Sequence, residues 1–128
     1  MPRRMSCSMT VPAVRARTKT VTRRHPATWR NLLPGDRLVL IEKGMGLPKG
    51  ARQVVLAQVE IVANRLEPLA LIVNARELDR EGCAEMTAPE FVDMWCRSHG
   101  YGHIVDGLDR LALICRRIEW RYLTEAPE

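Results

Sequence analysis

Two long stretches of alternating residues, 52–63 and 111–123, constrain the fold of this chain most strongly. In the first, every second residue is apolar from position 55 to position 61. In the second, apolar and charged residues alternate from position 118 to position 122. A period of two is typical of strands that bury one face, so each stretch predicts a long β-strand.

A third strand is predicted over residues 37–43, where an apolar run indicates burial on both faces. A tight turn over residues 32–36 precedes it, and the glycine-rich segment 44–50 follows it as a loop. The pair Arg116-Arg117 interrupts the alternation of the last strand, so we expect a β-bulge near it.

Three helices are expected, one before the first of these strands and two between the second and the last. Thr10 is placed to cap a helix over residues 10–17. The pattern Asn74-Ala75-Arg76-Glu77 is that of a capping box, and it predicts a short helix that ends at Gly82. A second capping box, Thr87-Ala88-Pro89-Glu90, predicts a longer helix ending near Gly100.

The order of these elements lacks the regular βαβ alternation of a doubly wound sheet, so we expect an α+β fold or a small mixed β-barrel. A chain of 128 residues, 46% of them apolar and 27% charged, can bury a core as one domain. We therefore expect a single domain over residues 1–128, with residues 1–8 flexible and residues 124–128 as a tail.

Positive charge is concentrated at the start of the chain. Residues 1–35 hold eight Lys and Arg and no Asp or Glu, whereas the remainder is mildly acidic. Five of the ten residues from 15 to 24 are cationic, and three of the others are threonines. This pattern predicts an anionic partner, with nucleic acid as the first candidate. A membrane surface is not expected as the partner, since no long amphipathic helix accompanies the charge.

The sequence contains neither an apolar run of membrane-spanning length nor the apolar region of a secretory signal, so we expect a cytoplasmic protein whose four cysteines stay reduced. The spacing of Cys96, His99 and His103 suggests zinc. A structural zinc site needs four ligands, however, and no fourth is obvious, with Cys83 and Asp106 no more than candidates. We expect no metal and no other cofactor.

Several motifs together resemble the ASCH domain of the PUA-like superfamily, in particular small stand-alone proteins of bacteriophages and prophages. The resemblance extends from about Ser8 to Leu123. It implies a compact PUA-like β-barrel with short helices packed at one end, and a cleft where the basic segment meets the region of Glu81. The motifs are Lys19-Thr20-Val21-Thr22-Arg23-Arg24, Trp29, Leu33-Pro34-Gly35-Asp36, Glu81-Gly82, Met86-Thr87, Glu90-Phe91 and Ile118-Glu119-Trp120-Arg121-Tyr122-Leu123.

The resemblance also implies RNA binding. In one branch, the acetylcytidine amidohydrolases, it implies catalysis by a Lys, a Thr three residues later and a Glu ahead of the Met-Thr helix start. These positions fall on Lys19, Thr22 and Glu81. The chain departs from the family pattern at Arg17, where glycine is common. Glu81 also lies farther from Met86 than the family glutamate does, so Glu85 competes for that role.

The residues themselves support this chemistry. A threonine hydroxyl becomes a nucleophile when a base removes its proton, and a lysine serves as that base when neighbouring cations disfavour its charged form. Glu81 would protonate a leaving amine or hold the lysine in place. In a regular strand Lys19 and Thr22 face opposite sides, so they converge only if the segment turns. Alternatively, Lys19 contacts phosphate and Thr22 packs or caps.

We expect first a module that binds RNA or a modified nucleoside in a basic cleft. In it, arginines and Lys19 hold phosphate, threonines add hydrogen bonds, and a base lies near Trp29. A hydrolase of base-linked amides is the second hypothesis. A ribonuclease and a phage protein that blocks a host protein partner are further alternatives. The predicted nucleic-acid-binding residues are Arg15, Arg17, Lys19, Thr20, Arg23, Arg24 and Trp29.

Overall fold

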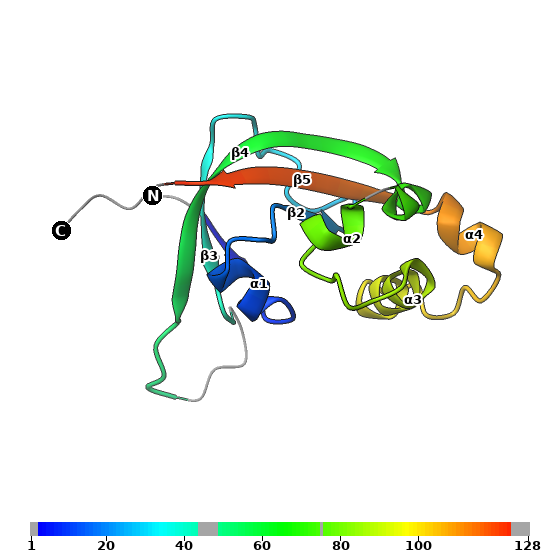
Figure 1. Ribbon diagram of the computed structural model, residues 1–128, viewed down its shortest axis with the longest axis horizontal. Coiled ribbons are helices and arrows are strands. Elements are labelled where there is room, and N and C mark those ends of the chain that lie inside the picture. The colour runs from blue at the N-terminus through cyan, green and yellow to red at the C-terminus, as the bar shows by residue number, and fades with distance from the viewer. Residues whose placement is uncertain (1–2, 44–48, 75, 124–128) are drawn as a thin grey trace.

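Five strands form one curled sheet, a half-barrel, in the order β1-β3-β4-β5-β2 (Figure 1). The computed structural model describes residues 3–43, 49–74 and 76–123. β1 runs parallel to β3, and the other neighbours are antiparallel. The strands are β1 (Arg3–Ser6), β2 (Val21–Arg24), β3 (Arg37–Ile41), β4 (Val55–Pro68) and β5 (Ile114–Tyr122).

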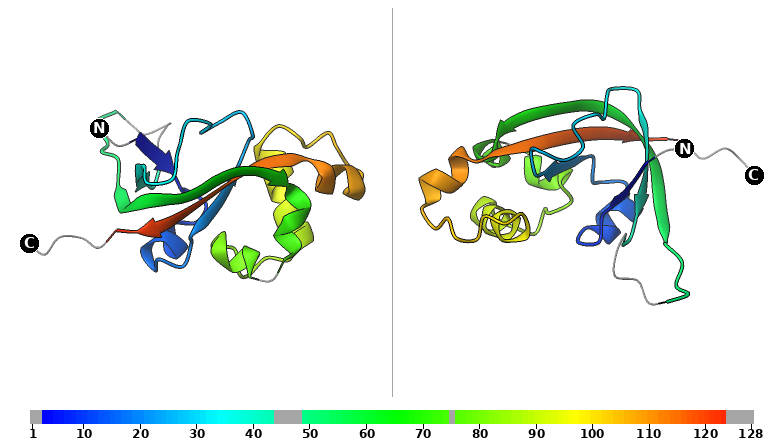
Figure 2. Two further views of the ribbon diagram at one scale, coloured as in Figure 1. Left: turned by 90° about the horizontal axis from the view of Figure 1, so that it is seen from above. Right: turned by 180° about the vertical axis from the view of Figure 1, so that it is seen from behind.

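The two alternating stretches form the centre of this sheet, as expected. β4 and β5 pair along most of their length, from Val59 opposite Tyr122 to Pro68 opposite Ile114. The register shifts between Ile61 and Ala63, so the bulge lies in β4 and not at Arg116-Arg117 in β5. A bulge strengthens the local twist, and here it accompanies the bend of β4 over the molecule (Figures 1 and 2).

β1 contradicts the expectation that residues 1–8 are flexible. Arg3–Ser6 pairs in register with residues 38–41 of β3, and the Met5 side chain is fully buried. A strand of four residues is too short to show a period, and its pairing with β3 depends on distant sequence. The tail at 124–128 and most of the predicted loop at 44–50 lie outside the described residues.

The helices lie mainly on one side of the sheet. Figures 1 and 2 show β4 and β5 passing over α1, α2 and α3, while α4 leads into β5. The elements are α1 (Val11–Arg15), the 3-10 helix η1 (Leu69–Val73), α2 (Glu77–Arg80), α3 (Ala88–Ser98) and α4 (Gly107–Ala112). The described fold is thus α+β, with a half-barrel and short helices.

The capping box predicted for α3 is confirmed, whereas the prediction of a capping box for α2 is wrong. Thr87 accepts from the Glu90 amide, and the Glu90 side chain accepts from the Thr87 amide. At α2 the residue before the helix is Arg76, in a left-handed conformation at φ 67°, and no side chain caps the helix. Asn74 instead ends η1, because the chain turns from one helix directly into the next.

The predicted ends of several elements also shift. α1 stops at Arg15 instead of position 17, β3 stops at Ile41, and β4 continues five residues beyond position 63. The last strand begins at Ile114, because Asp106 caps an unexpected helix, α4, through the amides of Leu108 and Asp109.

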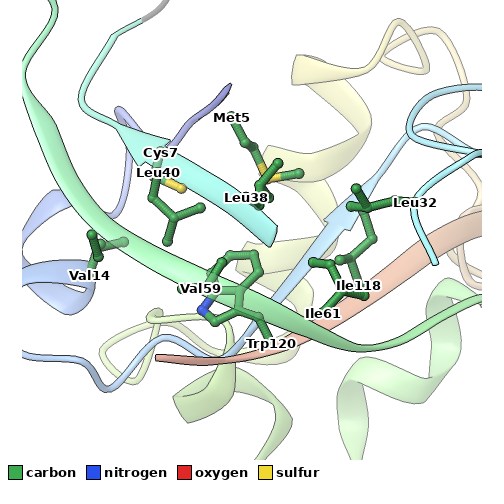
Figure 3. Close-up of a cluster of buried hydrophobic side chains, with 11 residues drawn as sticks. Met5, Cys7, Val14, Leu32, Leu38, Leu40, Val59, Ile61, Ile118 and Trp120 are labelled. Carbon is green, nitrogen blue, oxygen red and sulfur yellow. The ribbon is translucent and has the colours of Figure 1, made fainter. Parts of the chain in front are cut away.

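Two apolar clusters form the core. The first packs side chains of β1, β3, β4 and β5 around Trp120 (Figure 3). The second joins η1 to α3, around Phe91 and Trp95, and reaches Cys115 in β5. In β5 the buried Arg117 lies between Cys115 of the second cluster and Ile118 of the first. The buried Glu67 lies near the end of β4, between Ile61 of the first cluster and Leu69 of the second. Buried charge therefore occupies the junction between the two cores.

Candidate functional site

A pocket of about 250 Å³ lies between the two edge strands of the curled sheet. Its walls come from the segment that follows β1, from Lys19 and β2, from the end of α2, and from α3. The lining residues are Ser6, Cys7, Ser8, Met9, Thr10, Lys19, Thr22, Arg23, Arg24, Glu81, Cys83, Phe91, Met94, Trp95, Ser98 and His99.

The pocket follows the free edge of β2. Three successive residues of this strand line it, although successive side chains of a strand point to opposite faces. The guanidinium of Arg24 reaches across to β1, where its Nη2 donates to the Ser6 carbonyl at 2.7 Å. Arg24 therefore bridges the open side of the half-barrel at the pocket.

Lys19 and Glu81 meet in this pocket, and both are almost fully buried. Nζ of Lys19 donates to the Glu81 carbonyl oxygen at 2.6 Å and lies 3.4 Å from its carboxylate Oε1. Lys19 precedes β2, so the alternation of the strand does not direct its side chain. A left-handed residue, Arg17 at φ 61°, turns the chain just before it.

Thr22 lies in the same pocket and is 4% exposed. Its Oγ1 accepts a hydrogen bond from Nε of Arg24 at 3.1 Å, because residues two apart share a face of the strand. The turn before β2 thus removes the geometric objection to a pocket shared by Lys19 and Thr22.

Arg23 points into a buried network of carboxylates. Its guanidinium lies 3.0 Å from Glu81, 3.0 Å from Glu67 and 2.6 Å from Glu77. Arg117 adds a second cation on Glu77, at 2.8 Å. We call this set the charge network; its members are Lys19, Arg23, Arg117, Glu67, Glu77 and Glu81, with equal numbers of cations and anions. Arg23 thus lines the pocket while its guanidinium pairs with three carboxylates of the protein itself.

The surroundings shift several pKa values. Burial lowers the pKa of Arg23, but Glu81, Glu77 and Glu67 more than offset it, so the net pKa is raised. Burial raises the pKa of Glu77, yet hydrogen bonds from Arg117 and Arg23 reverse this and bring it to about 2. Burial also lowers the pKa of Arg24 and raises the pKa of the Cys7 thiol.

Aromatic rings form the wall on the α3 side. The rings of Trp95 and His99 stack with centroids 4.4 Å apart, and Tyr101 stacks with Trp95 at 5.7 Å. Nε1 of Trp95 donates to the Arg23 carbonyl at 3.0 Å, which joins α3 to β2. Burial lowers the pKa of His99, although its hydrogen bond to the Trp95 carbonyl acts in the opposite sense.

The other predicted binding residues do not line the pocket. Arg15 is exposed and lies 3.9 Å from Glu42, and the guanidinium of Arg17 lies over the Tyr122 ring. Thr20 donates its amide to the Arg80 carbonyl. Trp29 packs against the first core cluster, with the Arg3 guanidinium over its ring, and does not line the pocket.

The predicted catalytic trio, Lys19, Thr22 and Glu81, does line one pocket, whereas the competitor Glu85 is exposed outside it. The sequence reasoning missed the wall at residues 6–10 and the acceptors Glu67 and Glu77. Residues 6–10 lie at and after the end of β1, which is too short to show the alternation of a strand. Arg23 pairs with glutamates 44 and 54 positions away, and no local sequence pattern indicates such pairs.

The zinc-type spacing with Cys96 and His103 is the signal in the sequence that points to His99. Within residues 3–43, 49–74 and 76–123, no three His, Cys, Asp or Glu side chains are grouped to hold a metal ion.

None of the helices in this described part is long and apolar enough to cross a membrane.

Comparison with known proteins gives information on the fold alone. No protein-family model matches the sequence, and no curated protein matches it. Among solved structures, the chain is similar to the crystal structure of hypothetical protein PH0355, with a TM-score of 0.60 at 13% sequence identity. The match covers 96% of this chain and 100% of that chain. At this identity the likeness shows a shared fold.

Proposed function

We propose that this protein binds a modified nucleoside in the pocket and hydrolyses an amide bond on its base, as an ASCH-type member of the PUA-like superfamily. The observation that carries the proposal is that Lys19 and Thr22 line one pocket with Glu81, which is about 60 positions away in the sequence, and that each is at most 4% exposed. Burial of all three side chains favours a site that encloses a small ligand over a surface that contacts a phosphate backbone.

The size of the pocket supports a nucleoside as the ligand. Pockets for small molecules have volumes of roughly 300–1,000 Å³, and this pocket, at about 250 Å³, lies just below that range and suits a ligand no larger than a nucleoside. A double helix would instead need a wide, open basic surface. The pocket suits a single nucleoside, free or turned out of a strand.

The chemistry begins at Thr22. Its Oγ forms a bond to the amide carbon while its proton passes to Nζ of Lys19. The carbon–nitrogen bond then breaks, and Lys19 returns the proton to the leaving nitrogen, which releases the amine. Water hydrolyses the threonyl ester and releases the carboxylic acid. Arg24 donates to Oγ1 at 3.1 Å, so it stabilises negative charge that develops on that oxygen.

Glu81 acts in this scheme by positioning Lys19. A neutral amine has two N–H groups and one lone pair. The carbonyl oxygen and the carboxylate of Glu81 accept from Lys19 at 2.6 Å and 3.4 Å, which leaves the lone pair for the proton of Thr22. The other carboxylate oxygen accepts from Arg23 at 3.0 Å. Because Lys19 and Arg23 contact its two oxygens, the positioning role fits Glu81 better than that of proton donor.

Hydrolysis of N4-acetylcytidine tests the proposal. We expect the wild type to release acetate and cytidine, and Thr22→Ala to lose at least about a hundredfold in kcat/KM with the fold intact. Thr22→Ser keeps a hydroxyl and should retain part of the activity. Thr20→Ala is the matched control, since Thr20 lies outside the pocket. A wild type inactive on N4-acetylcytidine and other acylated nucleosides would refute the proposal.

RNA remains a second candidate, as the carrier of that nucleoside. The side chains of Arg3, Arg4 and Arg15 are exposed on the segment that leads around the pocket wall. Phosphate contacts there would give RNA affinity that falls with salt, with a log–log slope of about −0.7 for each phosphate contacted. Arg15→Gln should make that slope shallower, and an unchanged slope would exclude Arg15 from RNA contact.

A further inference from the structure

His99 stands at the end of α3 with its ring against the pocket. Nδ1 lies 2.8 Å from the Trp95 carbonyl oxygen and 3.1 Å from Oγ of Ser98. A carbonyl oxygen only accepts hydrogen bonds, so Nδ1 carries a proton. The hydroxyl of Ser98 donates to the same carbonyl, at 3.1 Å, which leaves its own oxygen free to accept from Nδ1.

This arrangement determines the chemistry of the other ring nitrogen. Burial favours the neutral form of the ring by lowering the pKa of His99, and the charged or titratable groups that act on it are Arg24, His25 and Glu81. In a neutral imidazole with a proton on Nδ1, Nε2 holds a lone pair and accepts. No residue of the described part of the chain hydrogen-bonds to Nε2.

The ring of His99 lines the pocket, and its hydrogen bonds fix how the ring is turned. Nδ1 faces the helix's own last turn, so Nε2 lies on the far side of the ring, away from the helix end. Stacking on Trp95, with centroids 4.4 Å apart, fixes the plane of the ring. Among the charged side chains of the pocket wall, Arg24 is a donor, and the carboxylate of Glu81 already accepts from Lys19 and Arg23.

We propose that Nε2 of His99 accepts a hydrogen bond from an N–H group on the base of the bound nucleoside. The pocket then selects bases that carry an exocyclic amine or its amide, as cytosine does. The inference rests on the proposed function, because the amide of the substrate and the amine of the product both supply this donor. It concerns recognition only and needs no catalytic step.

Equilibrium binding tests it without turnover. The probes are cytidine and pyrimidin-2-one riboside, which lacks the 4-amino group and adds no bulk. One neutral hydrogen bond predicts that the wild type binds cytidine about three- to tenfold more tightly. His99→Phe keeps a ring to stack on Trp95 and should bind the two probes equally. His99→Gln restores an acceptor and should recover part of the preference.

His103→Phe is the matched control, because His103 is exposed and lies outside the pocket; it should keep the wild-type preference. The tautomer is read on the wild type itself, from the ring nitrogen shifts in a long-range ¹H–¹⁵N spectrum, with the proton expected on Nδ1. A proton on Nε2 would overturn the inference. So would a wild type that binds both probes equally or binds neither, or a His99→Phe variant that keeps the preference.

The acetylcytidine assay judges the proposed function separately. Hydrolysis with no role for His99 in probe selection would overturn this inference alone. Selection by His99 without hydrolysis would support the inference and count against the proposed activity.

Discussion

The guanidinium of Arg23 lies 2.6 Å from the carboxylate of Glu77, at the centre of the charge network. The Arg23 side chain is fully buried, and Glu67 and Glu81 accept from the same group at 3.0 Å. One cation thus stabilises three buried anions, of which Glu81 also holds Lys19. The network therefore links the stability of the fold to the geometry of the pocket.

Removing that cation should be costly. Arg23→Met leaves the buried carboxylates without their shared partner, and we expect a loss of about 3–5 kcal/mol in the free energy of unfolding, measured by urea titration. Arg121→Met is the control: its side chain is 60% exposed and pairs with Glu60, so we expect less than about 1 kcal/mol. Equal losses in the two variants would show that the network does not stabilise the protein.

Acid should lower the free energy of unfolding, partly through protonation of Glu77. Its pKa in the folded state is about 2, below the ordinary value of 4.5, so the unfolded chain takes up its proton more readily. This contribution is complete above pH 4.5 and is lost as the pH falls toward about 2. Glu77→Gln should lower stability at neutral pH and make the decline with acid shallower, as read from urea midpoints. A decline as steep as that of the wild type would contradict this.

Gly82 should tolerate a side chain poorly. Its φ is +79°, and an added Cβ would lie 2.7 Å from Cβ of Ala13 and 3.2 Å from Cβ of Lys19. Gly100, at φ +85°, has no atom within 4 Å of an added Cβ and is the matched control. We expect Gly100→Ala to lose about 1–2 kcal/mol through strain, and Gly82→Ala at least about 1 kcal/mol more through crowding. Equal losses would mean that α1 and Lys19 move aside freely.

The cap of α3 provides another matched pair. Thr87 accepts from the Glu90 amide, whereas Thr10, which precedes α1, makes no side-chain cap. Thr87→Ala should therefore lower the free energy of unfolding by about 1 kcal/mol, and Thr10→Ala by clearly less. Thermal unfolding of both variants measures the difference, and a larger effect at Thr10 would contradict the assignment.

Sequence reasoning succeeded for α3, β4 and β5, whose signals are local, although the equally local capping-box pattern at Asn74 was wrong. The capping box at Thr87 and the alternation in β4 and β5 report on neighbours a few positions apart, and the structure contains α3 and both strands. β1 was missed because a parallel partner in β3 leaves no mark on four residues. The position of the bulge was predicted wrongly, because it depends on how β4 and β5 pair and not on either strand alone.

The candidate site, too, was predicted in part. The basic segment and Glu81 were recognised, and they do line one pocket. A run of cations, however, does not reveal which side chains turn inward: Arg23 meets glutamates 44, 54 and 58 positions away, and Arg15 stays at the surface. Such pairing follows from the curl of the sheet and from the turn before Lys19.

The most direct test of the central claim is mass spectrometry of the protein quenched in acid during turnover of N4-acetylcytidine. The account predicts one added acetyl group on the peptide that contains Thr22, absent from Thr22→Ala and from unreacted protein. Turnover with Thr22 unmodified, acetylation at another residue of that peptide, or no turnover at all would contradict it.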